Sequence, residues 1–299
     1  MSVQLLTGPC GTGKTRYMYE KMIKDSLEKE HNPIIYLLPE QSNMIAEQDM
    51  ISLHPLGGTM DISILSFSRL AYQVFDKENV YTGDVLDDYG KSMLIMKVLR
   101  EHAKELKYYG NMLGKKGFVD EVKSIISEFY QYGVSIATLK DLIDNLSPDT
   151  SLYHKISDLI IICTYFEEAM DNSFMVAEKL LSLLADNVEE SGLLKEADIY
   201  FDGFTGFTPV QYKVIERMMK VCRNMYFSVM IDEQTVDDNS DYKGLFSMGK
   251  DTISNLYKIA EKNNIKVLPH IPFGNIYRIE NNRELLHLEN NIFRYPIRE

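Results

Sequence analysis

The chain has 299 residues, of which 45% are hydrophobic and 25% charged, a composition typical of globular proteins and sufficient for two packed cores. Its longest aliphatic stretches, such as Leu159 to Ile162, are far shorter than the roughly 20 apolar residues of a membrane-spanning helix, and the N-terminus has no signal-peptide pattern. We therefore expect a cytoplasmic protein without a membrane partner. The formal net charge of -12 excludes a generally basic surface, so contact with nucleic acid would need a local basic groove or a partner subunit.

Short apolar runs alternate with helical patterns in the first part of the chain, as in a parallel sheet with crossover helices. Strands are expected at residues 3–7, 34–38 and 62–65. Helices are expected at residues 15–28, 42–52 and 66–76.

From about residue 85 to residue 196, apolar residues recur three and four apart, which predicts a helical block. Its expected helices cover residues 85–108, 118–132, 136–145 and 152–187, the last with a break near residue 171 or 172.

Strand patterns return at residues 197–201, 225–231 and 265–268, with helices expected at 209–222 and 252–263. The predicted fold is α/β: a P-loop NTPase (RecA-like) parallel sheet with helices on both faces, plus an inserted all-helical domain. Residues 1–84 and 197–299 form the two parts of the sheet domain, residues 85–196 form the insertion, and we expect the last part to be truncated.

The chain lacks the spacing of a cysteine or histidine metal site. Its three cysteines, Cys10, Cys163 and Cys222, form no C-x-x-C pair, and no two of its six histidines lie three or four residues apart. We expect neither a disulfide framework nor an iron-sulfur cluster or zinc site in this segment.

The strongest motif follows the first predicted strand. Residues 8–15 fit the P-loop pattern G-x-x-x-x-G-K-T, between a predicted strand and a predicted helix. Glycines let backbone N–H groups surround phosphates, and the helix adds its positive N-terminal end. ATP and Mg²⁺ are therefore expected, with Lys14 reaching the β- and γ-phosphates and Thr15 binding Mg²⁺. The expected nucleotide-binding residues in this loop are Gly8, Pro9, Cys10, Gly11, Thr12, Gly13, Lys14 and Thr15.

Such a site also needs an acid at the end of a nearby strand, and two acids compete. Asp232 with Glu233, after the apolar run of residues 226–231, has the better local pattern, because it offers a magnesium ligand and a second carboxylate. Asp202 follows another apolar run but precedes a glycine.

Several stretches together resemble the B-subunit family of the AddAB (RexAB-like) ATP-dependent helicase/deoxyribonucleases, relatives of superfamily 1 helicases. The specific ones are Ser-Phe-Ser-Arg-Leu-Ala at residues 66–71 and Asp-Gly-Phe-Thr-Gly-Phe-Thr-Pro at residues 202–209. They are joined by the P-loop, by Leu-Pro-Glu-Gln at residues 38–41 and by Leu-Glu-Asn-Asn-Ile-Phe at residues 288–293. The resemblance covers essentially the whole chain, but only the N-terminal part of the longer protein that is typical of the family.

The resemblance implies further site residues. It places Asp202 as the magnesium acid, and so as a catalytic residue beside Lys14, and it makes Gln234 the sensor of the γ-phosphate. It also implies that two strand-end loops lie along single-stranded DNA, with Arg69 on phosphate and Phe67 stacked on a base; the alternative is that Phe67 is core and Arg69 pairs with an acid. The implied DNA-binding residues are Glu40, Gln41, Phe67, Ser68 and Arg69.

Two departures from the helicase pattern bear on catalysis. Gly203 stands where an active helicase has the glutamate that positions water, and the seven residues before Gly8 leave no place for an adenine-reading glutamine. We therefore expect weak or no ATP hydrolysis.

Three functions stay open. The first is the ATP-binding, helicase-like region of one component of a helicase/exodeoxyribonuclease that acts in double-strand break repair by homologous recombination, partnered by DNA and by the A subunit in a heterodimer. The others are a non-hydrolysing DNA-binding or scaffold domain and a stand-alone P-loop phosphotransferase.

Overall fold

The computed structural model describes residues 1–28, 31–58, 61–80, 83–170, 174–232 and 244–292. The chain divides into two compact units. One contains residues 1–77, 187–207 and 215–299, and the other contains residues 78–186 and 208–214.

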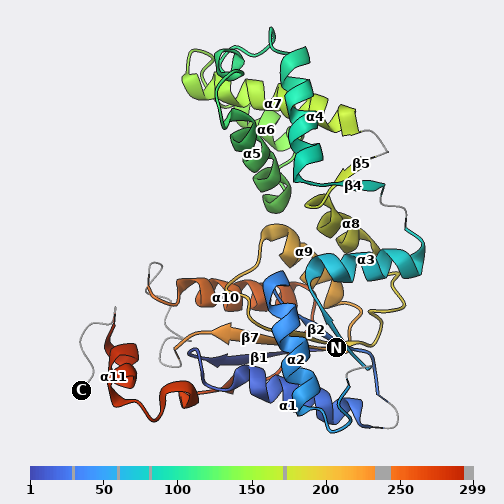
Figure 1. Cartoon of the computed structure of the whole chain (residues 1–299), viewed down its shortest axis with the longest axis vertical. Coiled ribbons are helices and arrows are strands. Elements are labelled where there is room, and N and C mark those ends of the chain that lie inside the picture. Colours follow the sequence, from blue (N-terminus) through green and yellow to red (C-terminus); the bar gives the residue numbers. More distant parts are fainter. Residues whose placement is uncertain (29–30, 59–60, 81–82, 171–173, 233–243, 293–299) are drawn as a thin grey trace. The chain divides into compact units, whose positions relative to one another are not determined.

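The first unit is built on a seven-stranded sheet in the order β3-β2-β6-β7-β1-β8, with β9 also paired to β1 (Figure 1). Every described strand pair in it is parallel, which confirms the predicted α/β class with a largely parallel sheet. The strands are β1 Ser2–Gly8, β2 Ile34–Leu37, β3 Ile62–Leu65, β6 Asp198–Phe201, β7 Asn224–Met230, β8 Lys266–Val267 and β9 Ile271–Pro272.

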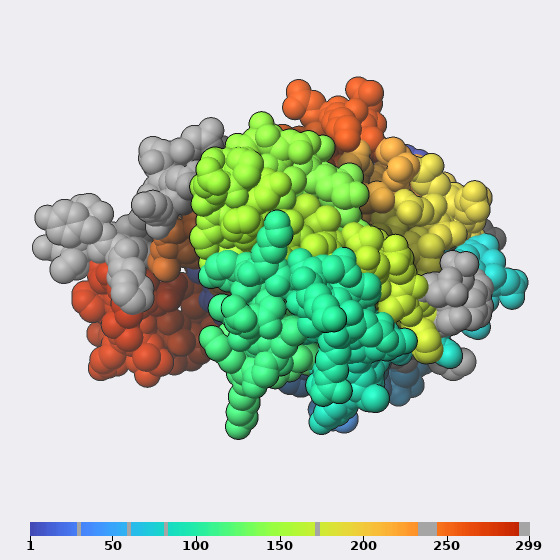
Figure 2. All heavy atoms as spheres, turned by 90° about the horizontal axis from the view of Figure 1, so that it is seen from above, coloured from blue at the N-terminus to red at the C-terminus, as the bar shows by residue number. Residues whose placement is uncertain are grey.

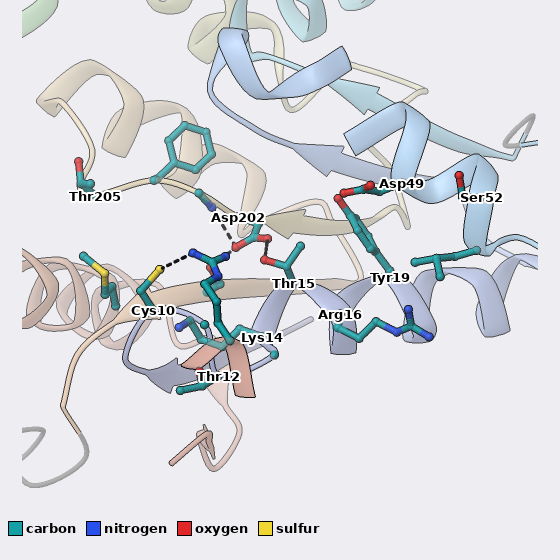
Figure 3. Close-up of a pocket in the computed structure, with 18 residues that line it drawn as sticks. Cys10, Thr12, Lys14, Thr15, Arg16, Tyr19, Asp49, Ser52, Asp202 and Thr205 are labelled. Atoms are coloured by element: carbon teal, nitrogen blue, oxygen red, sulfur yellow. Dashed lines mark hydrogen bonds between the residues drawn. The ribbon is translucent and has the colours of Figure 1, made fainter. Parts of the chain in front are cut away.

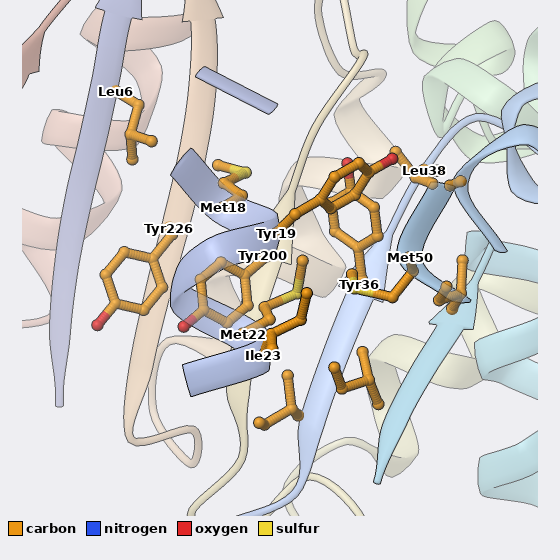
Figure 4. Packing of buried hydrophobic residues seen from close by; sticks show 14 residues of the cluster. Leu6, Met18, Tyr19, Met22, Ile23, Tyr36, Leu38, Met50, Tyr200 and Tyr226 are labelled. Atoms are coloured by element: carbon orange, nitrogen blue, oxygen red, sulfur yellow. The ribbon is translucent and has the colours of Figure 1, made fainter. Parts of the chain in front are cut away.

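Helices cover both faces of this sheet. Helices α1 and α2 pack on one face over a buried cluster that includes Met18, Met22, Tyr36, Met50 and Tyr200 (Figure 4). Helix α10 lies on the opposite face (Figure 1). The helices named in this unit and at its boundaries are α1 Lys14–Ser26, α2 Asn43–Leu53, α3 Phe67–Glu78, α9 Pro209–Met218, α10 Ser247–Lys262 and α11 Arg283–Asn291, with the 3₁₀ turns η1 Glu40–Ser42 and η4 Tyr277–Ile279.

The second unit is mainly helical. Its helices α4 to α7, coloured green to lime in Figure 2, form a continuous body around a core that includes Ile95, Val122, Ile162 and Phe166. A two-stranded parallel sheet joins β4 Asp84–Leu86 to β5 Phe174–Val176. The other elements are α4 Asp88–Glu101, η2 Gly110–Met112, α5 Phe118–Tyr132, α6 Ile136–Ile143, α7 Ser151–Met170 and α8 Lys179–Asn187.

Several helices differ from the ranges that the sequence pattern predicts, two of them clearly. The one expected at 85–108 begins only at Asp88, because the Asp87 side chain accepts the Gly90 backbone N–H at 2.7 Å and caps the helix there. The stretch expected at 152–187 is interrupted, as expected, after Met170: it forms two helices, α7 and α8, but the strand β5 between them was not expected. The domain limits at residues 84 and 196 stay a prediction.

Among the described helices, none combines the length and the apolar character that crossing a membrane requires.

A buried carboxylate organises a loop of the second unit. Asp158, which is 1% exposed, accepts the backbone N–H groups of Lys107, Tyr108 and Tyr109 at 3.0, 2.8 and 2.8 Å. Replacement by alanine would leave three donors without their partner.

We therefore expect Asp158→Ala to lower the free energy of unfolding by about 3 kcal/mol, measured by urea denaturation of the whole chain. The matched control is Asp149→Ala, at an exposed position, which should stay within about 0.5 kcal/mol of the unsubstituted chain. Equal stability of the two variants would contradict this account of Asp158.

Candidate nucleotide-binding site

A cavity of about 660 Å³ opens in the first unit beside the P-loop motif, a volume suited to a small-molecule ligand (Figure 3). It lies where the strands β1, β6 and β7 end, as expected for a ligand site in a parallel sheet. It is lined by residues 10–16 and by Tyr19, Asp49, Ser52, Leu53, Asp202, Gly203, Phe204, Thr205, Ser228, Met230 and Arg278.

The loop between β1 and α1 depends on its glycines. Gly13, directly before α1, has a left-handed backbone with φ of 92°, which favours glycine. A Cβ atom at Gly8 would lie 2.2 Å from the Phe273 carbonyl oxygen, and one at Gly11 would lie 2.8 Å from Arg278 Cβ. The motif therefore needs glycine both for its turn and for the close approach of residues 273–278.

Lys14 is folded back onto the loop. Its Nζ atom donates hydrogen bonds to the carbonyl oxygens of Gly8 and Pro9, both at 2.7 Å. Burial lowers the pKa of Lys14, and the negative charge of the Asp202 carboxylate opposes this shift. The ammonium group therefore lies within the same loop that would surround a bound phosphate.

Asp202 joins the loop to the end of β6. Thr15 Oγ1 donates to Asp202 Oδ2 at 2.6 Å, although the two residues are far apart in sequence. Because the hydroxyl proton points to the carboxylate, the lone pairs of Thr15 Oγ1 stay available to a cation. A hydroxyl and a carboxylate are oxygen ligands of the kind that Mg²⁺ prefers, so these two residues fit the ion.

Three more groups hold the Asp202 carboxylate. Tyr36 Oη on β2 donates to Oδ2 at 2.8 Å, the Gly203 backbone N–H donates to Oδ1 at 2.9 Å, and Ser228 Oγ on β7 donates to the same Oδ1. Burial raises the pKa of Tyr36 well above its ordinary value, and the Asp202 charge adds to the shift, so the tyrosine hydroxyl keeps its proton.

Arg278 adds a positive charge to the cavity wall. Its backbone N–H donates to the Gly11 carbonyl at 3.3 Å, and its Nη1 donates to Cys10 Sγ at 3.6 Å. It forms no ion pair with a carboxylate within the described ranges, so its guanidinium charge is not neutralised there.

The structure brings together the predicted loop residues and Asp202 but not the second candidate acid. Cys10 to Thr15 line the cavity together with Asp202, whereas Asp232 is absent from the lining residues. Glu233 and Gln234 lie outside the described residues. Tyr36, Ser228 and Arg278 also belong to the site but were not expected there. For the first two, the available signal was a hydroxyl group within each of the apolar runs at 34–38 and 225–231.

The residues expected at DNA lie apart from the cavity lining. Glu40 and Gln41 are exposed in the turn after β2, and Ser68 is half-buried in the first turn of α3. Arg69 is exposed, with its Nη1 3.7 Å from Glu47 Oε1. These two turns follow adjacent parallel strands and so share one edge of the sheet.

Phe67 is buried, in agreement with the alternative weighed for it. Its side chain is 5% exposed, and its ring packs against Phe201, Phe204 and Phe207 with centroids 6.1, 5.7 and 6.4 Å away. Stacking of Phe67 on a base would require the ring to leave this cluster, so the geometry does not favour that predicted role.

Within the part of the chain that the structure describes, no group of three or more histidine, cysteine, aspartate or glutamate side chains could hold a metal ion.

The parallel α/β sheet with a cavity at its carboxyl edge defines a class of ligand-binding proteins, and comparison with known sequences identifies the family within it. A family model described as "ADDB, N-terminal" matches residues 5–289. The chain belongs to this family.

Its curated relatives are named as the B subunits of ATP-dependent helicase/deoxyribonucleases. The proteins of Lachnoclostridium phytofermentans and Caldanaerobacter subterraneus subsp. tengcongensis are each 34% identical to this chain, and that of Acetivibrio thermocellus is 30% identical. Each alignment covers 99% of this chain but 26% of the relative, so the chain spans about a quarter of the length of these proteins.

The three thiols differ enough in burial to predict their reactivity. Cys10 is exposed on the loop, whereas Cys163 and Cys222 are buried. Burial raises the pKa of Cys163 to about 12 and raises that of Cys222 as well. Because the thiolate is the nucleophile, iodoacetamide at about pH 8 should label only Cys10 in the folded chain and all three thiols in denaturant.

Peptide mapping by mass spectrometry measures this selectivity, and Cys10→Ser is the control that should abolish the fast labelling. Labelling of Cys163 or Cys222 at the rate of Cys10 would be incompatible with the described packing.

Proposed function

We propose that this chain binds Mg-ATP in the cavity beside residues 8–15. The observation that carries the proposal is the hydrogen bond from Thr15 to Asp202, which joins the loop to a strand-end carboxylate at a distance of 2.6 Å. Together with the buried Lys14, it unites a phosphate-binding cation and two magnesium ligands in one cavity.

Each residue has a definite part in the proposed site. The backbone N–H groups of the loop and the first turn of α1 would bind phosphate oxygens, and Lys14 would exchange its two carbonyl partners for them. Thr15 and Asp202 would hold Mg²⁺, which neutralises phosphate charge when bound. Arg278, with no carboxylate partner in the described ranges, would give a further positive charge to the phosphates.

Hydrolysis by this chain should be weak. Gly203 follows Asp202 with φ of 73°, a left-handed conformation in which a glutamate would be strained. Its backbone N–H is already used on the Asp202 carboxylate. Among the described residues that line the cavity, the acids are Asp202 and Asp49, and Asp49 lies on α2. The site therefore suits binding of ATP better than activation of water.

We further propose that the chain is the N-terminal region of the B subunit of an ATP-dependent helicase/deoxyribonuclease that acts in double-strand break repair by homologous recombination. Its partners would be the A subunit and DNA. The support for this is membership of the family and the name shared by its curated relatives.

The proposed DNA contact is the sheet edge that carries Glu40, Gln41, Ser68 and Arg69. Arg69 is the basic residue among them, and its ion pair with Glu47 is exposed, so its release would cost little. Such a local contact is compatible with the acidic total charge of the chain.

Replacement of Lys14 tests the nucleotide site. Lys14→Ala should weaken binding of Mg-ATP about 30-fold or more, because it removes a charge-assisted hydrogen bond worth about 2 kcal/mol. Isothermal titration calorimetry measures the change. The control is Lys24→Ala on the same helix, which removes an exposed lysine and should leave the affinity unchanged.

Cys10 gives a second measurement on the unsubstituted chain, because Mg-ATP should slow its alkylation. Equal heats from Lys14→Ala and the unsubstituted chain, or no heat from either, would refute the nucleotide site. Binding of single-stranded DNA without any effect of nucleotide would instead support the DNA-binding scaffold.

Replacement of Arg69 tests the DNA edge. Arg69→Ala should weaken binding of single-stranded DNA and reduce the slope of log affinity against log salt concentration by about 0.7, as expected for one lost phosphate contact. Fluorescence anisotropy across a salt series measures both.

The matched control for Arg69 is Arg217→Ala, which likewise breaks an exposed ion pair, that with Glu189, but lies at the end of α9. If both variants bound DNA alike, the contribution of Arg69 would be disproved.

A further inference from the structure

Tyr36 is a buried tyrosine whose hydroxyl group points at the proposed magnesium carboxylate. Its side chain has no solvent exposure, and its Oη lies 2.8 Å from Asp202 Oδ2. It comes from the middle of β2 and is remote from the P-loop in sequence. Nothing in the P-loop motif itself calls for this residue.

The hydrogen bonds to Asp202 are divided evenly between its two carboxylate oxygens. Oδ2 accepts from Thr15 and Tyr36, and Oδ1 accepts from Ser228 and the Gly203 backbone. Because donors reach both oxygens, this set fixes the plane of the carboxylate as well as its position. Only Thr15 belongs to the P-loop; the other donors come from strands β2 and β7 and from the turn after β6.

The ring of Tyr36 has little freedom to leave this position. It packs edge-on against Tyr19 of α1, with centroids 5.6 Å apart and an interplanar angle of 78°. β2 pairs with β6 so that Tyr36 lies opposite Tyr200 and Leu37 opposite Phe201, the residue before Asp202. The sheet register therefore brings the Tyr36 hydroxyl to the carboxylate without any loop between them.

We infer that Tyr36 is a positioning residue for magnesium: its hydroxyl group orients the Asp202 carboxylate so that Asp202 and Thr15 receive the ion together. This inference rests on the proposed nucleotide site. Groups that orient a metal ligand typically change metal affinity or activity by 10- to 100-fold when removed. Ser228 holds the other carboxylate oxygen in the same way.

Tyr200 provides a closely matched control. It lies opposite Tyr36 on the neighbouring strand, it also has no solvent exposure, and its hydroxyl group also donates to a carboxylate, Asp25 Oδ2, at 3.2 Å. Asp25 is not among the residues that line the cavity. Replacement of either tyrosine by phenylalanine removes one buried hydroxyl group, but only Tyr36→Phe removes it from the proposed site.

The experiment compares ATP affinity with Mg²⁺ and with EDTA for the full chain, Tyr36→Phe and Tyr200→Phe, using isothermal titration calorimetry. Tyr36→Phe should lower the affinity in Mg²⁺ about tenfold or more and leave the affinity in EDTA unchanged. Tyr200→Phe should match the unsubstituted chain under both conditions. Thermal unfolding of both variants checks that they are folded, and Ser228→Ala should show the same Mg²⁺-specific loss if Tyr36→Phe does not fold.

Three outcomes would overturn the inference. If Tyr36→Phe binds Mg-ATP as well as the unsubstituted chain does, the hydroxyl group does not position the carboxylate. If it loses affinity equally in Mg²⁺ and EDTA, or if Tyr200→Phe shows the same loss, the effect is one of general packing. If the unsubstituted chain itself fails to bind Mg-ATP, the proposed function fails, and the inference that rests on it fails too.

Discussion

The carboxylate of Asp202 is the constraint on which the site depends. It accepts hydrogen bonds from β2, from β7, from its own turn and from the first turn of α1, so four segments must be correctly placed for it to be satisfied. A carboxylate that is 5% exposed would be costly without these donors. The parallel sheet supplies the placement, because all its carboxyl ends face one edge. The fold of the sheet and the geometry of the candidate site therefore both depend on the correct placement of these four segments.

Most of the sheet could be predicted because its longer strands are largely buried. Ile34–Leu37 is a continuous apolar run, and Ile62–Leu65 has three buried apolar residues around Ser63; such runs are informative when both faces of a sheet are covered. The strands β4 and β5 could not be predicted, since three residues give no periodicity and Asp84 is unusual for a strand. Of the two short strands at the edge, β8 lies within the strand expected at residues 265–268, whereas β9 could not be predicted: it has two residues, and its pairing with β1 depends on contacts over more than 200 residues of sequence.

The candidate site was predictable where a local motif encodes it and not where the sheet assembles it. Residues 8–15 carry their own turn chemistry, so the loop could be located from sequence. Local pattern favoured Asp232 over Asp202, because a following glutamate is visible in sequence whereas the neighbouring strand is not. In the structure, it is Asp202, at the end of β6, that meets Tyr36, Ser228 and Thr15. Arg278 reaches Gly11 only through tertiary structure.

The pairing of β1 has a consequence for biosynthesis. Ser2–Gly8 is the first strand of this sheet to be made, yet its neighbours in the sheet are residues 224–230, 266–267 and 271–272. Strand β1 must therefore remain unpaired until these later residues have left the ribosome. Closing so long a loop is slow, and an unpaired strand is prone to aggregation in the interval. We therefore expect the loop of residues 8–15 to be among the last parts of this unit to become ordered, although it is among the first to be translated.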